Sequence, residues 1–242
     1  MIRLQLFEFE DYAWYPKVIR EGQTDYLRFL MEFFGVFKGA SPLIKELMDN
    51  SPHQNIIDFC SGGGGSMLMM YHLMYQQYGI KLQAQLSDLY PNLPAFETIA
   101  QQSDGCISYQ KKPVNVLQSP PNEAGIYTIF NGFHHFTPQQ AQNILNNFAQ
   151  QNKSIGIFEP MDKSGLQLLI NIVSTSLLLF LTMPFVRPFK WQNLVFTYLI
   201  PLIPIGTCWD GIASWFRLYD ANRLQKMADQ VKDEVIEKKS SV

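Results

Sequence analysis

Residues 56–66, with the sequence IIDFCSGGGGS, decide what the rest of this 242-residue chain is built around. The apolar start of this run is typical of a short buried strand, and an apolar helical pattern over residues 67–78 follows the four glycines. Because glycine adopts backbone angles that other residues avoid, the run lets the chain turn sharply between strand and helix. The amides at the helix N-terminus then face a nucleotide-like ligand. The stretch therefore predicts a ligand site.

Strands and helices alternate from here to about residue 160. Apolar runs that end in polar clusters predict strands at 55–59, 82–86, 125–131 and 154–158, and a short strand between 107 and 117 that carries 114–116. Helical patterns separate them at 67–78, 93–101 and 138–150, the last with Thr137 as N-cap. This order predicts an α/β, Rossmann-like, doubly wound and mostly parallel sheet with ligands at the carboxyl ends of the strands. We divide the chain into a helical cap (1–50), this core (51–163), a hydrophobic hairpin or lid (164–219), and a helix with a polar tail (220–242).

Composition narrows the classes of function. The net charge is −2 and the pI is near 6.1, and no basic stripe with interleaved aromatic residues is present, so nucleic acid is not an expected partner. Cys60, Cys106 and Cys208 are widely spaced and odd in number, which indicates neither a disulfide framework nor a zinc site. The acidic N-terminus lacks the apolar run of a signal peptide, and we expect a cytoplasmic protein.

The first 50 residues are rich in aromatic side chains. Apolar positions recur at helical spacing over 24–37, with Thr24 or Asp25 as N-cap and Gly39 as the stop, and 43–48 reads as another short helix. Core packing is a simpler explanation of these aromatic residues than direct contact with a substrate. We therefore expect a helical cap in front of the sheet.

The spacing of the glycine run removes two classes of ligand site. A phosphate-binding loop of the GxxxxGK[ST] type needs a lysine after its last glycine, where Ser66 and Met67 stand. A dinucleotide fingerprint GxGxxG counted from Gly62 needs a small residue at Met67. What remains is an acidic residue at the strand end followed by glycines two apart, in the segment DFCSGGG.

This segment resembles the first motif of the class I S-adenosylmethionine-dependent methyltransferases, an acidic residue followed by GxGxG. Cys60 stands where the first glycine is usual, and a small residue fits there if its backbone angles are ordinary. In that family the loop passes under the methionine part of the cofactor. The resemblance therefore implies cofactor contacts from Asp58, Cys60, Ser61, Gly62 and Gly64. The alternative is a glycine-rich turn that only lets helix and strand pack closely.

Two further strand ends resemble the same family. Asp88 follows the second strand, where the family has an acidic residue that accepts hydrogen bonds from both ribose hydroxyls, and Leu89 would then flank the adenine. Asn115 lies where an aspartate often meets the adenine amino group, and Val116 follows it; an amide oxygen can accept the same hydrogen bond. A turn or cap role for Asp88 before Pro91 is the alternative.

The strand at 125–131 ends in the segment NGFHHF, which is similar to the His-His-Phe of family members that act on quinones, lipids and other small molecules. The resemblance implies Asn131 as a further cofactor contact. Methyl transfer to an oxygen or a carbon acid needs removal of a proton, and a histidine with a near-neutral pKa suits that step. His134 or His135 is therefore the candidate base. The alternative is that one of the two histidines only hydrogen-bonds to the backbone and holds the loop, and His135 is the first candidate for that role.

Metal binding is not expected at this pair. Two adjacent histidines need a third ligand at matching spacing, and none is evident in the sequence. Glu159 and Asp162 follow the next strand end, where exposed carboxylates either cap a helix or orient a substrate.

Residues 164–209 are unusually apolar for a soluble α/β core. No charge occurs in 164–186 or in 191–209, and Arg187 and Lys190 lie between these two segments. The first segment has the length of a membrane span, but a crossing would place both cations opposite the catalytic domain, against the positive-inside tendency. Three alternatives stay open: a lid that packs on the cap, a hairpin that lies on or dips into one leaflet at the inner face of a membrane, and a true span.

The end of the chain departs from the family pattern. Residues 220–232 suit a helix with Asp220 as N-cap, but residues 233–242 show no strand alternation. The family fold usually finishes with an antiparallel strand pair. We therefore expect the last two strands to be missing, which leaves a sheet edge open or covered by the hairpin.

These motifs, which cover roughly residues 50–162, predict S-adenosylmethionine-dependent methyl transfer to a small, apolar or lipid-like acceptor, resting chiefly on proximity and alignment. The apolar acceptor is inferred from an aromatic cap that faces a charge-poor hairpin. The alternative is a membrane-surface binding or scaffold protein that keeps the fold with reduced turnover. A nucleotide-dependent oxidoreductase is opposed by the failed dinucleotide spacing. The sequence names neither the acceptor atom nor the oligomeric state.

Overall fold

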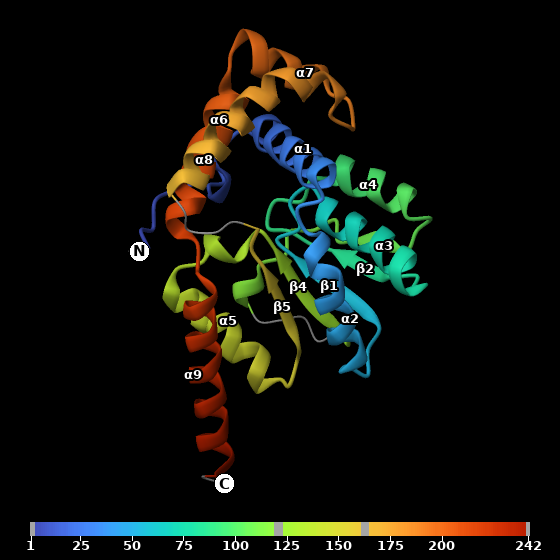
Figure 1. Ribbon diagram of the computed structural model, residues 1–242, viewed down its shortest axis with the longest axis vertical. Helices are drawn as coiled ribbons and strands as arrows, with labels where there is room; N and C mark the ends of the chain where they lie inside the picture. The colour runs from blue at the N-terminus through green and yellow to red at the C-terminus, as the bar shows by residue number, and fades with distance from the viewer. Residues whose placement is uncertain (1–2, 119–122, 161–164, 241–242) are drawn as a thin grey trace.

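The centre of the computed structural model, which describes residues 3–118, 123–160 and 165–240, is a sheet of five parallel strands (Figure 1). The order β3-β2-β1-β4-β5 confirms the predicted α/β doubly wound sheet. The strands are β1 (Asn55–Phe59), β2 (Gln83–Leu86), β3 (Ile107–Tyr109), β4 (Ile126–Phe130) and β5 (Ile155–Phe158). Strand β1 pairs with β2 on one side and with β4 on the other, so the strand order reverses there. A crevice for a ligand is expected beyond the carboxyl ends of these strands.

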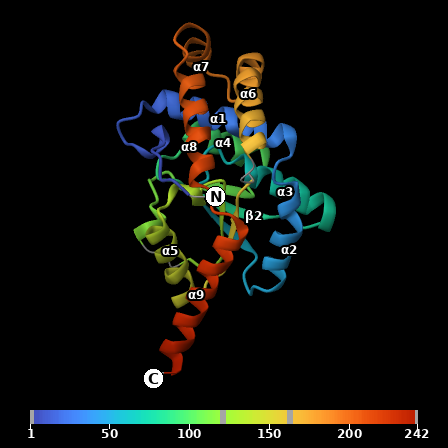
Figure 2. The same cartoon turned by 60° about the vertical axis from the view of Figure 1, so that its left-hand side comes forward.

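Helices cover both faces of the sheet (Figure 2). One face carries α2 (Ser41–Asp49), α3 (Gly65–Tyr78) and α4 (Leu93–Gln102), and the other carries α5 (Pro138–Gln150) and α9 (Ala221–Ser240). The helices predicted at 67–78, 93–101 and 138–150 are confirmed, and Thr137 caps α5 in a reciprocal capping box with Gln140. Helix α2, which we had grouped with the cap, packs on the sheet through Ile44 and Met48.

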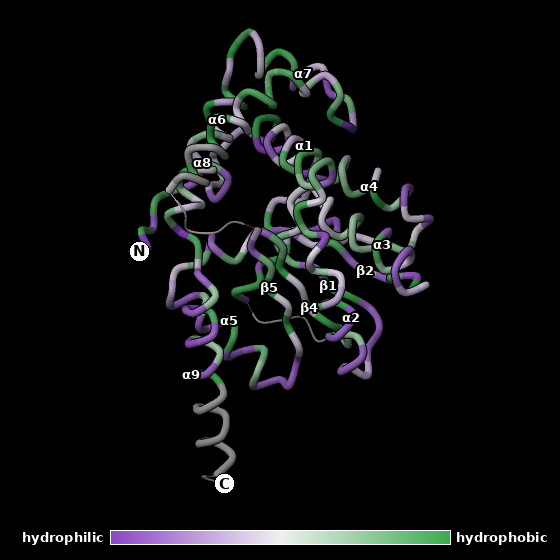
Figure 3. The backbone as a smooth tube through the Cα atoms, viewed as in Figure 1, coloured by the Kyte–Doolittle hydropathy of each residue, from purple (hydrophilic) through white to green (hydrophobic). Residues whose placement is uncertain are grey.

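The cap helix and the hydrophobic hairpin form a further layer beyond the strand ends. The hairpin comprises α6 (Gly165–Thr182), α7 (Trp191–Leu194), a π-helical turn (Val195–Leu199) and α8 (Leu202–Arg217), and hydrophobic residues follow much of it in Figure 3. Leu179 and Ile203 of the hairpin pack with Ile19 and Tyr26 of α1 (Lys17–Phe34). The hairpin therefore packs on the cap, as the lid alternative requires.

Among the helices of the described residues, no single one is both long and apolar enough to cross a bilayer. Trp191–Leu199 and Leu202–Arg217 meet the criterion only when taken together, and they are bent by 79° at the break between them.

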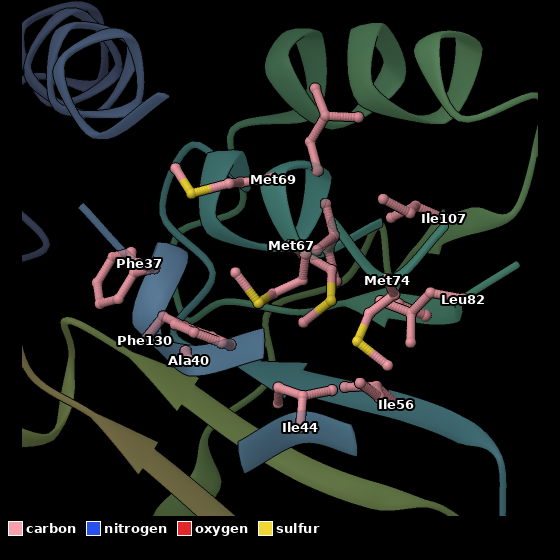
Figure 4. Close-up of a cluster of buried hydrophobic side chains, with 14 of the residues drawn as sticks. Phe37, Ala40, Ile44, Ile56, Met67, Met69, Met74, Leu82, Ile107 and Phe130 are labelled. Carbon is pink, nitrogen blue, oxygen red and sulfur yellow. The ribbon is translucent and has the colours of Figure 1, made fainter. Parts of the chain in front are cut away.

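Two apolar clusters, one on each face, hold the sheet to its helices. Figure 4 shows the first, in which Met67 and Met74 of α3 point at Ile56 of β1 and Ile44 of α2. On the opposite face Ile57, the next residue of β1, packs with α5 in the second cluster. Because side chains alternate along a strand, consecutive apolar residues serve both faces, which explains the unbroken apolar runs in the sequence.

The cap helix differs from its prediction. Helix α1 begins at Lys17 instead of the predicted Thr24 or Asp25, and it ends at Gly35, whose left-handed φ of +62° closes the helix before Gly39. The first turns were missed because their buried face carries polar residues such as Gln23, which hide the apolar periodicity.

Two features later in the chain also differ. The short strand predicted between 107 and 117 is present as β3, but it ends at Tyr109 and does not carry 114–116 as expected; a 3₁₀ turn begins at Val116. Pro113 precedes this segment and lacks the N–H that a strand ladder needs. After β5 the described residues contain helices and no strand; α9 follows the predicted N-cap Asp220, whose Oδ1 accepts the Arg223 N–H at 2.8 Å, and continues to Ser240.

Candidate functional site

Asp58 lies at the end of β1 and supports the glycine loop from beneath. Its Oδ1 accepts a hydrogen bond from the Thr128 hydroxyl of β4 (2.6 Å), and its Oδ2 accepts one from the Ser61 hydroxyl (2.7 Å). The Ser87 hydroxyl donates to the Asp58 carbonyl oxygen (2.8 Å), so the ends of β1, β2 and β4 are joined here. Burial raises the pKa of Asp58 to about 7, although both hydroxyl donors act to lower it. Asp58 is buried and lies outside the cavity lining, in contrast to the direct cofactor contact that we expected.

The four glycines of the loop face different neighbours. A Cβ at Gly63 would lie 2.7 Å from a carbonyl oxygen of α1, and one at Gly65 would lie 2.3 Å from a side chain of the same helix. A Cβ at Gly64, where φ is +74°, would lie 2.6 Å from a side chain of α4. At Gly62, where φ is +53°, the nearest atom would be 4.0 Å away. Close packing therefore explains three glycines, and Gly62 is the one with open space.

Cys60 adopts a left-handed backbone conformation, with φ of +54°. The condition under which a residue other than glycine fits easily here, ordinary backbone angles, is therefore not met, and the position is one that favours glycine, as in the family motif. A Cβ at Gly132 would lie 2.8 Å from Cys60 Cβ, so the loop after β4 passes close by. Burial, and then the charges of Asp88 and Asp58, raise the pKa of the Cys60 thiol well above its usual range. Cys60 is therefore a neutral thiol in the wall of the site.

Asp88 follows β2 and links it to the glycine loop. Its Oδ2 accepts the Gly62 N–H and its Oδ1 accepts the Tyr90 N–H, each at 2.8 Å. A carboxylate oxygen offers two lone pairs, so each oxygen retains one for a ribose hydroxyl. The bond to Tyr90 is also the turn role that was the alternative for Asp88. One carboxylate can therefore perform both roles.

The other predicted cofactor contacts lie around the same opening. Leu89 is exposed at its edge, and Val116 is buried between the cavity and the core. Asn115 Oδ1, which we expected to face the adenine amino group, already accepts a backbone N–H two residues later (3.0 Å) and has one lone pair left. Asn131 has φ of +50°, and its N–H donates to a carbonyl oxygen of β5 (2.8 Å), which fixes the loop after β4.

A cavity of about 960 Å³ joins these strand ends to the layer formed by α1 and the hairpin. The predicted residues that line it are Cys60, Ser61, Gly62, Gly64, Asp88, Leu89, Asn115, Val116, Asn131, His134 and His135. The lining continues onto α6 at Leu178 and onto α8 at Thr207 and Cys208. This volume lies at the upper end of the range for small-molecule sites.

His134 and His135 lie in a 3₁₀ turn after β4, with their rings stacked at 4.5 Å. Glu159 fixes His134 twice, through the His134 backbone N–H (3.0 Å) and through Nδ1 (2.9 Å). Since Nδ1 faces Glu159, Nε2 is the other ring nitrogen, and it lies 3.9 Å from Glu8 Oε2. Glu159 is thus a largely buried partner of His134 and not the exposed cap that we expected. Asp162 lies outside the described residues.

His135 is held between two carboxylates. Its Nδ1 lies 2.7 Å from Asp11 Oδ1 and 3.2 Å from Glu8 Oε2. Burial alone would lower the pKa of His135, but Glu8 and Asp11 outweigh it and raise the pKa to about 10. Burial would likewise raise the pKa of Asp11, but His135 and Arg217 lower it to about 2. His135 is therefore a cation at neutral pH, and its ring bonds to carboxylates and not to backbone, which leaves His134 as the candidate base.

Arg217, at the end of α8, ties this cluster together. Its Nη1 lies 2.6 Å from Asp11 Oδ2 and 3.1 Å from Glu8 Oε1, and its Nη2 donates to the His135 carbonyl oxygen. The sequence did not reveal Glu8, Asp11 or Arg217, because Arg217 is 206 positions from Asp11 and no motif connects them. Two features of the sequence could have indicated these residues. Arg217 ends a largely apolar helix, where a charged side chain is buried only if it is paired, and the N-terminal segment is acidic.

Glu10 and Asp210 form a second acidic pair in the cavity lining. Burial, reinforced by the charge of Asp210, raises the pKa of Glu10 to about 8. Burial also raises the pKa of Asp210 to about 6, against the opposing hydrogen bond from the Phe9 N–H (2.7 Å). Glu10 Oε1 is buried without a hydrogen-bond partner in the described part of the chain. Both carboxyl groups therefore hold their protons more tightly than in water, and they place polar groups in the cavity lining.

The structure places a third potential metal ligand beside the two histidines. Glu8, His134 and His135 each place one ligand atom within 4.8 Å of the other two, so the third ligand that the sequence lacked is present in space. Arg217 lies 3.1 Å from the same Glu8 carboxylate, and Asp11 already bonds to His135. These partners compete with a metal ion for the same groups.

No family model matches the chain, and no curated protein matches its sequence. Similar solved structures include an O-methyltransferase family protein from Burkholderia thailandensis, with 15% identity, a TM-score of 0.39, and coverage of 52% of this chain and 37% of that chain. Another is the mitomycin 7-O-methyltransferase MmcR, with 14% identity, a TM-score of 0.40, and coverage of 56% of this chain and 40% of that chain. The chain thus spans less than half the length of either protein. Its similarity to these two structures is one of fold, with a parallel five-stranded sheet.

Proposed function

We propose that this protein binds S-adenosylmethionine across the carboxyl ends of β1, β2 and β4 and transfers its methyl group to a small, apolar or lipid-like acceptor. One observation carries the proposal: Gly62, Asp88 and His134 come from three different strand ends and line one cavity of about 960 Å³. The open space at Gly62 and the free lone pairs of Asp88 fit a nucleoside with its ribose hydroxyls. Open strand ends of this kind are where doubly wound sheets bind such ligands.

Methyl transfer requires the protein to position the acceptor against the methyl group and to remove one proton from the acceptor. When bound, S-adenosylmethionine supplies an electrophilic methyl group. Glu159 orients His134 so that Nε2 can take the proton of the acceptor as its oxygen or carbon attacks that methyl. His135 is a fixed cation that stacks on His134 and holds the turn through Asp11 and Glu8. Alignment of the acceptor and the methyl group in this cavity then supplies most of the rate enhancement.

An apolar acceptor is favoured by the apolar side chains in the cavity lining. Leu30 and Met31 of α1 and Ile172 and Leu178 of α6 belong to that lining. The acidic pair formed by Glu10 and Asp210 places one polar anchor among them. A mostly apolar molecule with one hydroxyl or similar group fits such a lining best.

Calorimetric titration of the purified protein with S-adenosylhomocysteine tests the first step. We expect saturable heat for the wild type and a large loss of affinity for Asp88→Ala, because the ribose hydroxyls lose their acceptor. The absence of heat at millimolar ligand would refute the proposal.

Transfer of a labelled methyl group to a lipid extract tests the second step. His134→Gln should abolish transfer while S-adenosylhomocysteine still binds, whereas His72→Gln, an exposed histidine on α3, should behave as the wild type. Binding of the cofactor without transfer to any lipid fraction would instead support the scaffold alternative.

A further inference from the structure

The hairpin divides its apolar residues between two surfaces. Leu179, Met183, Val186 and Ile203 face inward and pack on α1, where they are buried. A second set faces solvent at the end of the hairpin, and we call this surface, within residues 181–200, the hairpin tip. Its main members are Leu181, Phe185, Phe189, Trp191, Leu199 and Ile200.

The exposure of the hairpin tip is large for a soluble surface. Phe185 is 66% exposed, Trp191 63% and Leu199 76%. In both Figure 1 and Figure 2 the region around α7 forms one end of the molecule, far from the end of α9. Contiguous apolar patches of this kind mark sites of contact with a protein or a membrane.

The charges at the hairpin tip favour a membrane with anionic lipids. Residues 164–209 contain no acidic residue. Lys190 is used internally, at 2.9 Å from both Glu21 and Asp25 of α1. Arg187 is exposed, and over the described residues no carboxylate forms an ion pair with it; its Nη1 reaches backbone carbonyl oxygens at 3.4 and 3.5 Å. An arginine among exposed tryptophan and phenylalanine side chains matches the headgroup level of an anionic bilayer.

The backbone geometry also suits a membrane surface. The 79° bend between Trp191–Leu199 and Leu202–Arg217 turns α7 across the axis of α8. Helix α8 can then stand upright on the surface while α7 lies along it, which is the orientation of an interfacial helix. We propose that the hairpin tip docks the protein on the surface of a bilayer that contains anionic lipids, with Trp191, Phe185 and Leu199 inserted and Arg187 at the phosphates.

Docking of the hairpin tip would also affect how an acceptor reaches the cavity, and this step rests on the proposed function. Helices α6 and α8 both reach from the hairpin tip to the cavity, where Leu178 and Thr207 line the wall. A lipid-like acceptor would therefore have a short path from the bilayer into the cavity.

Vesicle co-sedimentation tests the docking without any cofactor or turnover. The probes are vesicles of phosphatidylcholine alone and vesicles of equal parts phosphatidylcholine and phosphatidylglycerol. We expect the wild type to bind the anionic vesicles and Leu199→Asn to bind at least about tenfold less, because a large apolar group no longer enters the interface. Arg187→Glu should weaken binding to the anionic vesicles alone. The matched control is Tyr75→Ser on α3, since Tyr75 has the same exposed fraction as Trp191, 63%, and should bind like the wild type.

Trp191→Phe provides a second readout, tryptophan fluorescence. This variant keeps a large apolar side chain at the position, so it should not weaken folding. The wild type should show a blue shift of tryptophan fluorescence on anionic vesicles that is reduced in Trp191→Phe while sedimentation is retained. No binding of the wild type to either vesicle, or equal loss in Tyr75→Ser, would overturn the proposal. A dimer in solution that dissociates in Leu199→Asn would also overturn it and assign the hairpin tip to a second copy of the chain. Binding of S-adenosylhomocysteine is measured separately by calorimetry. A failure of membrane docking can therefore be distinguished from a failure of cofactor binding.

Discussion

Replacing Asp58 by asparagine should increase the stability of the protein relative to the wild type as the pH rises. Asp58 is buried at the junction of β1, β2 and β4, where its carboxylate accepts hydrogen bonds from Thr128 and Ser61. Burial raises its pKa from 3.8 to about 7. The folded state therefore holds the Asp58 proton more tightly than the unfolded state does, and ionisation of this group opposes folding.

The magnitude follows from this difference in pKa. The stabilisation from the bound proton is complete below pH 3.8 and is lost as the pH rises through about 7, which amounts to about 4 kcal/mol in total. Between pH 5 and pH 8 the change is about 2.5 kcal/mol. The amide of Asp58→Asn does not titrate, so its own effect on the two hydroxyl hydrogen bonds, about 1 kcal/mol each, is independent of pH.

Urea unfolding of the wild type and of Asp58→Asn at pH 5 and pH 8 measures this. The difference in unfolding free energy should move in favour of the variant by about 2.5 kcal/mol between the two pH values. Thr128→Val removes a donor that lowers the pKa of Asp58, so it should extend the loss of stability to higher pH. A difference between wild type and Asp58→Asn that is constant with pH, or that moves in favour of the wild type, would refute the assignment of Asp58 as a buried, protonated support.

Four further predictions concern the site itself. Asp88→Ala should weaken binding of S-adenosylhomocysteine by at least about tenfold in calorimetry, with Asp88→Asn intermediate; equal affinity in all three would exclude Asp88 as the ribose acceptor. The stability that His135 adds is complete below pH 6.5 and lost as the pH rises through about 10, so His135→Gln should destabilise at pH 6 and much less at pH 10; a ring that titrates near pH 6.5 by NMR would contradict this. Manganese or zinc should raise the melting temperature by less than about 1 °C, because Arg217 and Asp11 occupy the same groups; a larger rise that Glu8→Gln removes would show a metal site. Cys60→Gly should change the unfolding free energy by no more than about 1 kcal/mol and keep cofactor affinity; a larger loss in urea would mean that the thiol is a packing requirement.

The sheet could be predicted from the sequence because its signals are local. Each strand is an apolar run followed by polar residues, and Asp88 and His134 were found because they stand at such ends. Arg217 and Asp11 could not be found, since their meeting depends on how α8 and the N-terminal segment return to the end of β4. The backbone angle of Cys60 was also out of reach, because a side chain type does not report φ when packing imposes it.

The four glycines of the opening stretch now have separate causes. Gly64 is required by α4, while Gly63 and Gly65 are required by α1, whose backbone lies against the loop. Helix α1 in turn bonds to the hairpin, through the Tyr26 hydroxyl to the Thr175 carbonyl oxygen (2.6 Å) and through the ion pair of Lys190 with Asp25. The loop therefore contacts α1, and α1 contacts the hairpin, so a displacement of the hairpin tip has a steric route to the loop through α1. Gly62 keeps open space beside it, and its N–H is held by Asp88. A run that looks redundant in the sequence thus performs two tasks, because Gly63, Gly64 and Gly65 allow close packing against α1 and α4, and Gly62 leaves room beside Asp88.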